Sequence, residues 1–121
     1  MATRPGPPPS GYPPPRGRPG TPPPREKSLQ NSCLRILKER GLTGRKRHGD
    51  AYGVAGDPDL YFLCGRFHVE VELKRPGEEP TPLQRLRLAE WAKAGAITRV
   101  IHSTTEFRCF LDELPALIGA L

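Results

Sequence analysis

Apolar residues recur at helical spacing in the segment EKSLQNSCLRILKERG, residues 26–41. The stripe that they form consists of Leu29, Cys33, Ile36 and Leu37. This spacing places all four on one face, which predicts an amphipathic helix packed against a core. Gly41 is a residue type that commonly ends a helix. Glu26 lies in the first turn, where a carboxylate suits the helix dipole.

A different period appears in two segments further along the chain, DLYFL at 59–63 and RFHVEVELK at 66–74. In the second segment, apolar and polar residues alternate over eight positions, which is typical of a half-buried strand. We therefore predict two antiparallel strands joined around Gly65. A short strand is also expected within residues 42–47, and ITRVIH, residues 97–102, predicts another strand.

The segment TPLQRLRLAEWAKAG carries the signals of a helix N-terminus at its start. Thr81 suits the N-cap, Pro82 suits the first helical position, and Gln84 is placed to close a capping box. Gly95 is expected to end this helix. Trp91 falls at core-like spacing with the leucines of the segment, so we expect it to pack against other side chains rather than to stack on a base.

The segment STTEFRCFLDEL, residues 103–114, predicts a final helix. Ser103 and Glu106 have the spacing of another capping box, and Pro115 is expected to break or end the helix. Its apolar stripe is expected to lie in the core or in a dimer interface, and consists of Phe107, Phe110 and Leu114.

The order of the elements is helix, two or three antiparallel strands, helix, strand, helix. A strand, helix and strand in succession imply a right-handed crossover between parallel strands. Together these elements predict an α/β fold in which a mixed sheet is flanked by helices.

Residues 1–24 differ in composition from the rest of the chain. They hold 11 of the 16 prolines and almost no large apolar side chains. Such a segment cannot bury enough surface to offset its ordering entropy, so we predict a disordered, polyproline-like basic arm followed by one domain at 25–121. The arm lacks the apolar stretch of a signal peptide, and no run is long enough to cross a membrane. We therefore expect a cytoplasmic protein of a bacterium or of a phage-infected cell.

The net charge of +6 suggests an anionic partner, and nucleic acid is the commonest one. The run GRKRHG contains Arg45, Lys46 and Arg47, and Arg75 follows the predicted hairpin. We expect these four side chains to contact phosphate. A solvated loop is the alternative interpretation of the run.

The three cysteines, Cys33, Cys64 and Cys109, do not have metal-ligand spacing, and the three histidines are scattered. A zinc site is therefore not expected. We expect reduced thiols and no small-molecule cofactor.

The predicted hairpin places acids on both of its strands, and its register determines which of them meet. If Gly65 and Arg66 form the turn, Asp59 lies directly opposite Glu72. If the turn is one residue earlier, Asp59 faces Glu70 instead. Side chains directly opposite are about 5 Å apart at Cβ, and like charges there are destabilising unless something positive lies between them.

Two facing carboxylates can share a hard divalent cation such as Mg²⁺. Lys74 follows Glu72 by two residues and projects from the same face, and the main-chain carbonyl of Leu73 lies between them as a further possible ligand. Such a site suits phosphodiester hydrolysis, because the cation polarises the phosphoryl oxygen and acidifies water while a lysine stabilises developing charge.

Each of these residues also has a simpler interpretation. Asp59 follows proline, as in many turns, and Glu72 and Lys74 are compatible with a solvated strand face. Glu26 suits the helix dipole without binding metal, and Gln84 has a structural position in its capping box.

The motifs also resemble the VRR-NUC family, the virus-type replication-repair nucleases of the PD-(D/E)XK superfamily. The resemblance runs from about residue 26 to 105 and rests on several motifs in order. These are a helical glutamate with spaced apolar residues and a glycine, from Glu26 to Gly41; G-x-P-D-L at Gly56 to Leu60; E-x-K-R-P at Glu72 to Pro76; T-P-x-Q at Thr81 to Gln84; and Ala94-Gly95.

The resemblance implies a restriction-endonuclease-like αβββαβ core and a metal-dependent endonuclease. It implies that Glu26, Asp59 and Glu72 bind metal, that Lys74 is the catalytic lysine, and that Gln84 supports it. Small stand-alone members of phage and bacterial type resemble dimeric enzymes that cut branched DNA, so a homodimer is expected, since C₂ symmetry supplies two sites.

The leading hypothesis is therefore a Mg²⁺- or Mn²⁺-dependent DNA endonuclease, selective for Holliday junctions or other branched DNA, in recombination, repair or replication. The alternative is a non-catalytic nucleic-acid-binding protein on the same fold, using the arm and the basic loop. A third interpretation is a structural protein whose proline-rich arm docks on a partner.

Overall fold

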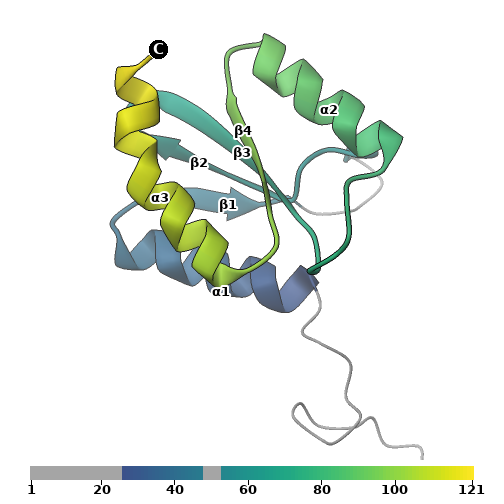
Figure 1. Cartoon of the computed structure of the whole chain (residues 1–121), viewed down its shortest axis with the longest axis horizontal. Coiled ribbons are helices and arrows are strands. Elements are labelled where there is room, and N and C mark those ends of the chain that lie inside the picture. The colour runs from purple at the N-terminus through teal and green to yellow at the C-terminus, as the bar shows by residue number, and fades with distance from the viewer. Residues whose placement is uncertain (1–25, 48–52) are drawn as a thin grey trace, which may run out of the picture.

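Figure 1 shows the computed structural model, which describes residues 26–47 and 53–121. The predicted arm at 1–24 lies outside the described residues. The strands are β1 (Gly44–Lys46), β2 (Leu60–Cys64), β3 (Phe67–Leu73) and β4 (Ile97–Ile101). The helices are α1 (Glu26–Glu39), α2 (Pro82–Lys93) and α3 (Thr104–Gly119). The predicted α/β fold and the order of its elements are confirmed.

The four strands form one mixed sheet in the order β1-β2-β3-β4. The first two pairs are antiparallel, and β3 and β4 are parallel because α2 crosses between them. Antiparallel pairing of β2 and β3 follows from the tight turn at Gly65, whose φ of 62° is in the left-handed region that glycine tolerates.

One face of the sheet carries the apolar core, which α1 and α3 cover. Alternate residues of β2 and β3, such as Phe62, Val69 and Val71, are fully buried there. Phe107 of α3 meets the Phe62 ring edge to face, with ring centroids 6.1 Å apart. The other buried residues of α3 are Phe110, Leu111 and Leu114, so the apolar stripe of this helix lies in the core.

The opposite face of the sheet is polar, and α2 covers part of it (Figure 1). Glu70 and Glu72 of β3 are both buried on this face. None of the residues of α2, all of which the structure describes, is buried. Trp91 packs on His68 and Arg47, so the prediction that it is a packing residue is confirmed, but its contacts lie on the polar face and not in the apolar core.

The prediction about the start of α2 is confirmed, and both predictions about the ends of α3 need correction. The capping box of α2 is confirmed, with Thr81 and Gln84 bonded reciprocally. At α3, the Ser103 side chain accepts from the Glu106 N–H, but the Glu106 carboxylate accepts from the main-chain N–H of His102, one residue before the N-cap. Pro115 does not end α3, which continues to Gly119.

The three cysteines are free, as predicted, and Cys33 is buried. Burial raises the pKa of the Cys33 thiol to about 12, so this residue behaves as a core side chain. In the part of the chain that the structure describes, no helix is long and apolar enough to cross a membrane.

Candidate active site

The register of the hairpin brings Asp59 and Glu72 together. Cys64 pairs with Phe67 and Leu60 pairs with Val71, and Asp59, just before β2, meets the side chain of Glu72. The main-chain N–H of Asp59 donates to the Val71 carbonyl at 3.0 Å. The first of the two predicted registers is therefore confirmed, because Gly65 takes the first position of the turn.

The two carboxyl groups contact each other below the protein surface. The Asp59 side chain is hydrogen-bonded to that of Glu72, and Glu72 is 1% exposed. Two ionised carboxylates this close repel each other, so the pair is unfavourable unless positive charge lies beside it. Burial raises the pKa of Asp59 above its ordinary value. The bonds to the Leu73 N–H and to Glu72 act in the opposite direction.

Lys74 completes this group of charges. Its Nζ lies 3.8 Å from Glu72 Oε2, and its side chain is 11% exposed. Its main-chain N–H donates to the Ile101 carbonyl at 3.0 Å, which fixes the end of β3 against β4. The positive charge of Lys74 favours the ionised form of Asp59 and lowers its pKa against the effect of burial.

The backbone of Asp59 is held from several sides. Its carbonyl accepts from the Arg47 N–H at 2.8 Å and from Gln30 Nε2 at 3.0 Å. Its Oδ2 accepts from the Leu73 N–H at 2.8 Å. Gln30 belongs to the α1 motif but was not predicted as a site residue. The signal for it is the spacing of four from Glu26, which places both positions on one face of α1.

The structure describes the position of Glu26 but not its side chain. Glu26 is the first residue of α1, one turn before Gln30. The main chain of α1 therefore begins beside the segment that carries Asp59. The predicted metal-binding role of Glu26 stays a prediction.

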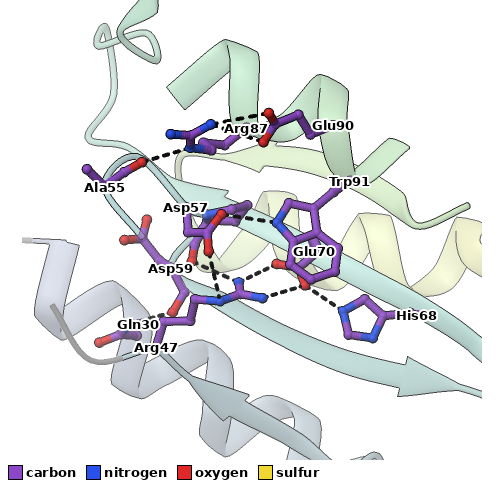
Figure 2. A network of polar contacts seen from close by, with 11 residues as sticks. Gln30, Arg47, Ala55, Asp57, Asp59, His68, Glu70, Arg87, Glu90 and Trp91 are labelled. Carbon is purple, nitrogen blue, oxygen red and sulfur yellow. Dashed lines mark hydrogen bonds and ion pairs between the residues drawn. The ribbon is translucent and has the colours of Figure 1, made fainter. Parts of the chain in front are cut away.

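Arg47, for which a phosphate contact was predicted and a solvated loop was the alternative, lies partly buried against the sheet. Its guanidinium turns inward and makes two hydrogen bonds to Glu70, which is fully buried, and one to the Pro58 carbonyl at 3.1 Å (Figure 2). Glu70 also bonds to His68. Both oxygens of Glu70 are therefore engaged by side chains other than those of the Asp59 pair. A phosphate contact by Arg47 would have to compete with these bonds.

The other predicted phosphate-binding residues lie nearer the surface. Arg45 and Lys46 are exposed on the edge strand β1. Arg75 is half-buried just after Lys74, and its N–H faces Glu78 Oε1 at 3.4 Å. Gln84 lies in the cap of α2, where its Oε1 accepts from the Thr81 N–H at 2.9 Å. The amide oxygen of Gln84 is thus engaged structurally.

The chemistry of the Asp59 pair fits a hard divalent cation. Among the described residues, no group of three or more His, Cys, Asp or Glu side chains is arranged to hold a metal ion. Mg²⁺, however, keeps several waters and is commonly held by only one or two carboxylates. Asp59 and Glu72 supply these, and the Leu73 carbonyl and Glu26 are the predicted additional ligands.

Solved structures show which fold class the chain has. No family model matches the chain, and no curated protein matches it. Solved structures that share its fold include a VRR_NUC domain, 25% identical over 72% of this chain and 94% of that chain, with a TM-score of 0.62. They also include a VRR_NUC domain protein, 20% identical over 77% and 89%, with a TM-score of 0.65. A third is Hjc, a Holliday junction resolvase from Archaeoglobus fulgidus, 20% identical over 64% and 67%, with a TM-score of 0.53.

The chain therefore has the restriction-endonuclease-like fold of the PD-(D/E)XK superfamily. Within that superfamily, the resemblance to the VRR-NUC family is confirmed.

Proposed function

We propose that the protein is a divalent-metal-dependent DNA endonuclease that cuts branched DNA in recombination, repair or replication. The observation that supports this most is the buried contact between the Asp59 and Glu72 carboxyl groups, with Lys74 Nζ 3.8 Å from Glu72. Two acids held against each other are unfavourable for folding alone. A cation bound by the two acids would make this arrangement favourable.

In the proposed mechanism, Asp59 and Glu72 would hold the cation, with the Leu73 carbonyl and Glu26 as further ligands. A bound Mg²⁺ or Mn²⁺ supplies charge that polarises a phosphoryl oxygen and acidifies water. Lys74 stabilises the negative charge that develops on the phosphate. Gln84, at the N-terminus of α2, is the proposed supporting residue.

The proposed DNA contacts use the basic surface beside the site. Arg45 and Lys46 lie exposed on β1, whose last residue pairs with Leu60, the neighbour of Asp59. Arg75 directly follows Lys74. Contacts of this kind with phosphate give a salt-dependent affinity.

Branched DNA and a homodimer are the most specific parts of the proposal. They are supported by the fold shared with a protein named as a Holliday junction resolvase. A four-way junction needs two symmetric cuts, and a C₂ dimer supplies two sites in the required relation.

The decisive experiment is cleavage of labelled four-way junction, flap, duplex and single-stranded DNA, each with Mg²⁺, Mn²⁺ or EDTA. The parent protein is compared with Glu72→Ala, Lys74→Ala and the matched control Glu113→Ala, which alters an exposed acid of α3. We expect paired, metal-dependent nicks on the junction. Glu72→Ala and Lys74→Ala should lose about 100-fold or more of the rate, whereas Glu113→Ala should cut like the parent.

Two results would contradict the proposal. Folded Glu72→Ala or Lys74→Ala protein that cuts as fast as the parent would remove the assigned chemistry. Metal-independent binding of DNA without cleavage of any substrate would identify a nucleic-acid-binding protein on the same fold.

A further inference from the structure

The polar face of the sheet carries a charged chain enclosed between two aromatic rings. Arg47, Glu70 and His68 are bonded in series, with Glu70 in the middle (Figure 2). The His68 ring stacks on Trp91 at 5.3 Å and on Tyr61 at 5.6 Å between centroids. The Arg47 guanidinium lies 4.8 Å from the Tyr61 centroid and 4.9 Å from that of Trp91.

The segment that leads into Asp59 is bonded to a cluster of side chains on this face. The cluster consists of Arg47, Tyr61, His68, Glu70 and Trp91. Arg47 donates to the Pro58 carbonyl at 3.1 Å and, from its main chain, to the Asp59 carbonyl at 2.8 Å. Its Nε lies 3.8 Å from Asp57 Oδ2. Trp91 Nε1 donates to the other oxygen of Asp57 at 3.2 Å. Residues 57, 58 and 59 are therefore each bonded to the cluster.

Further contacts of α2 serve the same segment. Leu83, Arg87 and Trp91 follow at intervals of four, so they share one face of the helix. Arg87 donates to the Ala55 carbonyl at 2.9 Å. Leu83 lies so close to Gly56 that a Cβ added there would come within 2.7 Å of it. This face of α2 thus contacts residues 55, 56 and 57.

Apolar side chains in place of this cluster would be expected to stabilise the fold at least as well. A buried ion pair is often no more stabilising than apolar side chains of similar size, because both charges lose their water. Here the fully buried carboxylate of Glu70 takes the place of an apolar contact between the sheet and α2. These bonds instead fix the orientation of Arg47, since a bidentate Arg–carboxylate pair holds the guanidinium in one position.

We propose that Arg47 is a positioning residue for Asp59, and that Glu70 and Trp91 hold it in place for this task. Arg47 does not touch DNA or metal. It fixes the Asp57–Asp59 segment so that the Asp59 carboxylate meets the cation at the same place as Glu72. The inference rests on the proposed function, because it assigns a task in a metal site.

The test measures metal binding separately from cleavage. Mn²⁺ alone is titrated into the full-length protein by calorimetry, at a temperature well below the unfolding midpoint of each variant. Arg47→Gln should weaken Mn²⁺ binding about 10- to 100-fold, as for other residues that orient a metal ligand. Arg47→Lys should not restore it, because a single ammonium cannot replace the fork of the guanidinium.

Two further variants make the result specific. Trp91→Phe keeps a ring over His68 but removes the bond to Asp57, so Mn²⁺ binding should weaken about two- to tenfold. If Arg47→Gln does not fold, the Mn²⁺ affinity of Trp91→Phe still tests the positioning role. Arg40→Gln is the matched control, because Arg40 pairs with Asp112 between α1 and α3, away from the polar face. Its Mn²⁺ affinity should equal that of the parent.

The outcomes separate this inference from the proposed function. If the parent binds Mn²⁺ and cuts DNA while folded Arg47→Gln and Trp91→Phe bind Mn²⁺ as tightly, the positioning role is wrong and the nuclease stands. A lower unfolding midpoint with unchanged Mn²⁺ affinity likewise shows a purely structural cluster. If the parent binds no Mn²⁺ and cuts nothing, the proposed function fails and the inference fails with it.

Discussion

At the residue scale, Asp59 is the most constrained position in the site. Its N–H, its carbonyl and its carboxyl group are all hydrogen-bonded, to Val71, to Arg47 and Gln30, and to Leu73. The main-chain bonds fix the position of Asp59, and the bond from Leu73 holds its carboxyl group beside that of Glu72. The fold therefore sustains a contact between two acids that Lys74 stabilises in part and that a bound cation would stabilise further.

This arrangement predicts that Asp59→Asn separates stability from activity. Asparagine keeps an oxygen for the Leu73 N–H and offers an N–H to Glu72, so the repulsion between two carboxylates is removed. In the absence of metal, the free energy of unfolding at neutral pH should rise by roughly 1 kcal/mol, or about 4 to 8 °C in the midpoint for a domain of this size. Cleavage should be lost. Thermal unfolding in EDTA and the junction assay measure the two effects.

Asp112→Asn is the control for this prediction. Asp112 is exposed and pairs with Arg40 at 2.8 Å, and exposed pairs contribute about 0 to 1 kcal/mol. Its midpoint should therefore stay equal or fall slightly. A clear loss of stability in Asp59→Asn would show that the carboxyl pair stabilises the fold, contrary to the argument.

At the element scale, His102 joins three elements near the end of the site. It follows β4, its Nδ1 lies 3.2 Å from Glu106 Oε1 in α3, and its Nε2 lies 3.0 Å from the Glu78 carbonyl in the loop after Lys74. Burial lowers the pKa of His102, but the bonds to Glu106 and Glu78 and the charges of Glu106 and Glu79 together raise it above 6.5.

The sign of this shift predicts a pH-dependent stability. A raised pKa means that the folded protein binds the proton more tightly than the unfolded chain. The contribution is therefore complete below the ordinary value of 6.5 and is lost as the pH rises through the folded pKa. Urea unfolding of the parent and His102→Gln should differ more near pH 5.5 than near pH 8.5, values of about one or two units on either side. An equal difference at both would exclude this role of His102.

Elements whose determinants are local could be predicted from the sequence. The alternation from Phe67 to Lys74 and the glycine at 65 define the hairpin register, and hence the meeting of Asp59 and Glu72. Thr81, Pro82 and Gln84 mark the start of α2 because a cap involves only neighbouring residues.

The remaining features depend on partners that are distant in sequence. Arg47 lies in a basic run without periodicity, and its partner Glu70 is 23 residues further along, so nothing local distinguishes it from a phosphate-binding arginine. The surroundings of Trp91 could not be predicted either, because helical spacing does not reveal that α2 faces a polar surface. Pro115 lies inside α3, so it removes one main-chain hydrogen bond there, yet the helix continues to Gly119.

At the scale of the whole molecule, the two faces of the sheet differ in composition and in role. The face under α1 and α3 is apolar and holds most of the buried residues. The face under α2 holds the carboxyl pair, Lys74 and the cluster around Arg47. The apolar face stabilises the fold, so the polar face can carry charges that contribute little to stability.

This division predicts that α2 opens locally without unfolding of the sheet. β3 is paired on both sides and is buried from Val69 to Leu73, whereas none of the described residues of α2 is buried. Amide hydrogens of α2 should therefore exchange at a lower opening free energy than those of β3, which should open only with global unfolding. Trp91→Ala, which removes the contact of α2 with His68 and Arg47, should speed exchange in α2 and leave β3 unchanged. Hydrogen exchange measured by mass spectrometry in increasing urea tests this. A common opening free energy for α2 and β3 would show instead that the polar face is bound as firmly as the core.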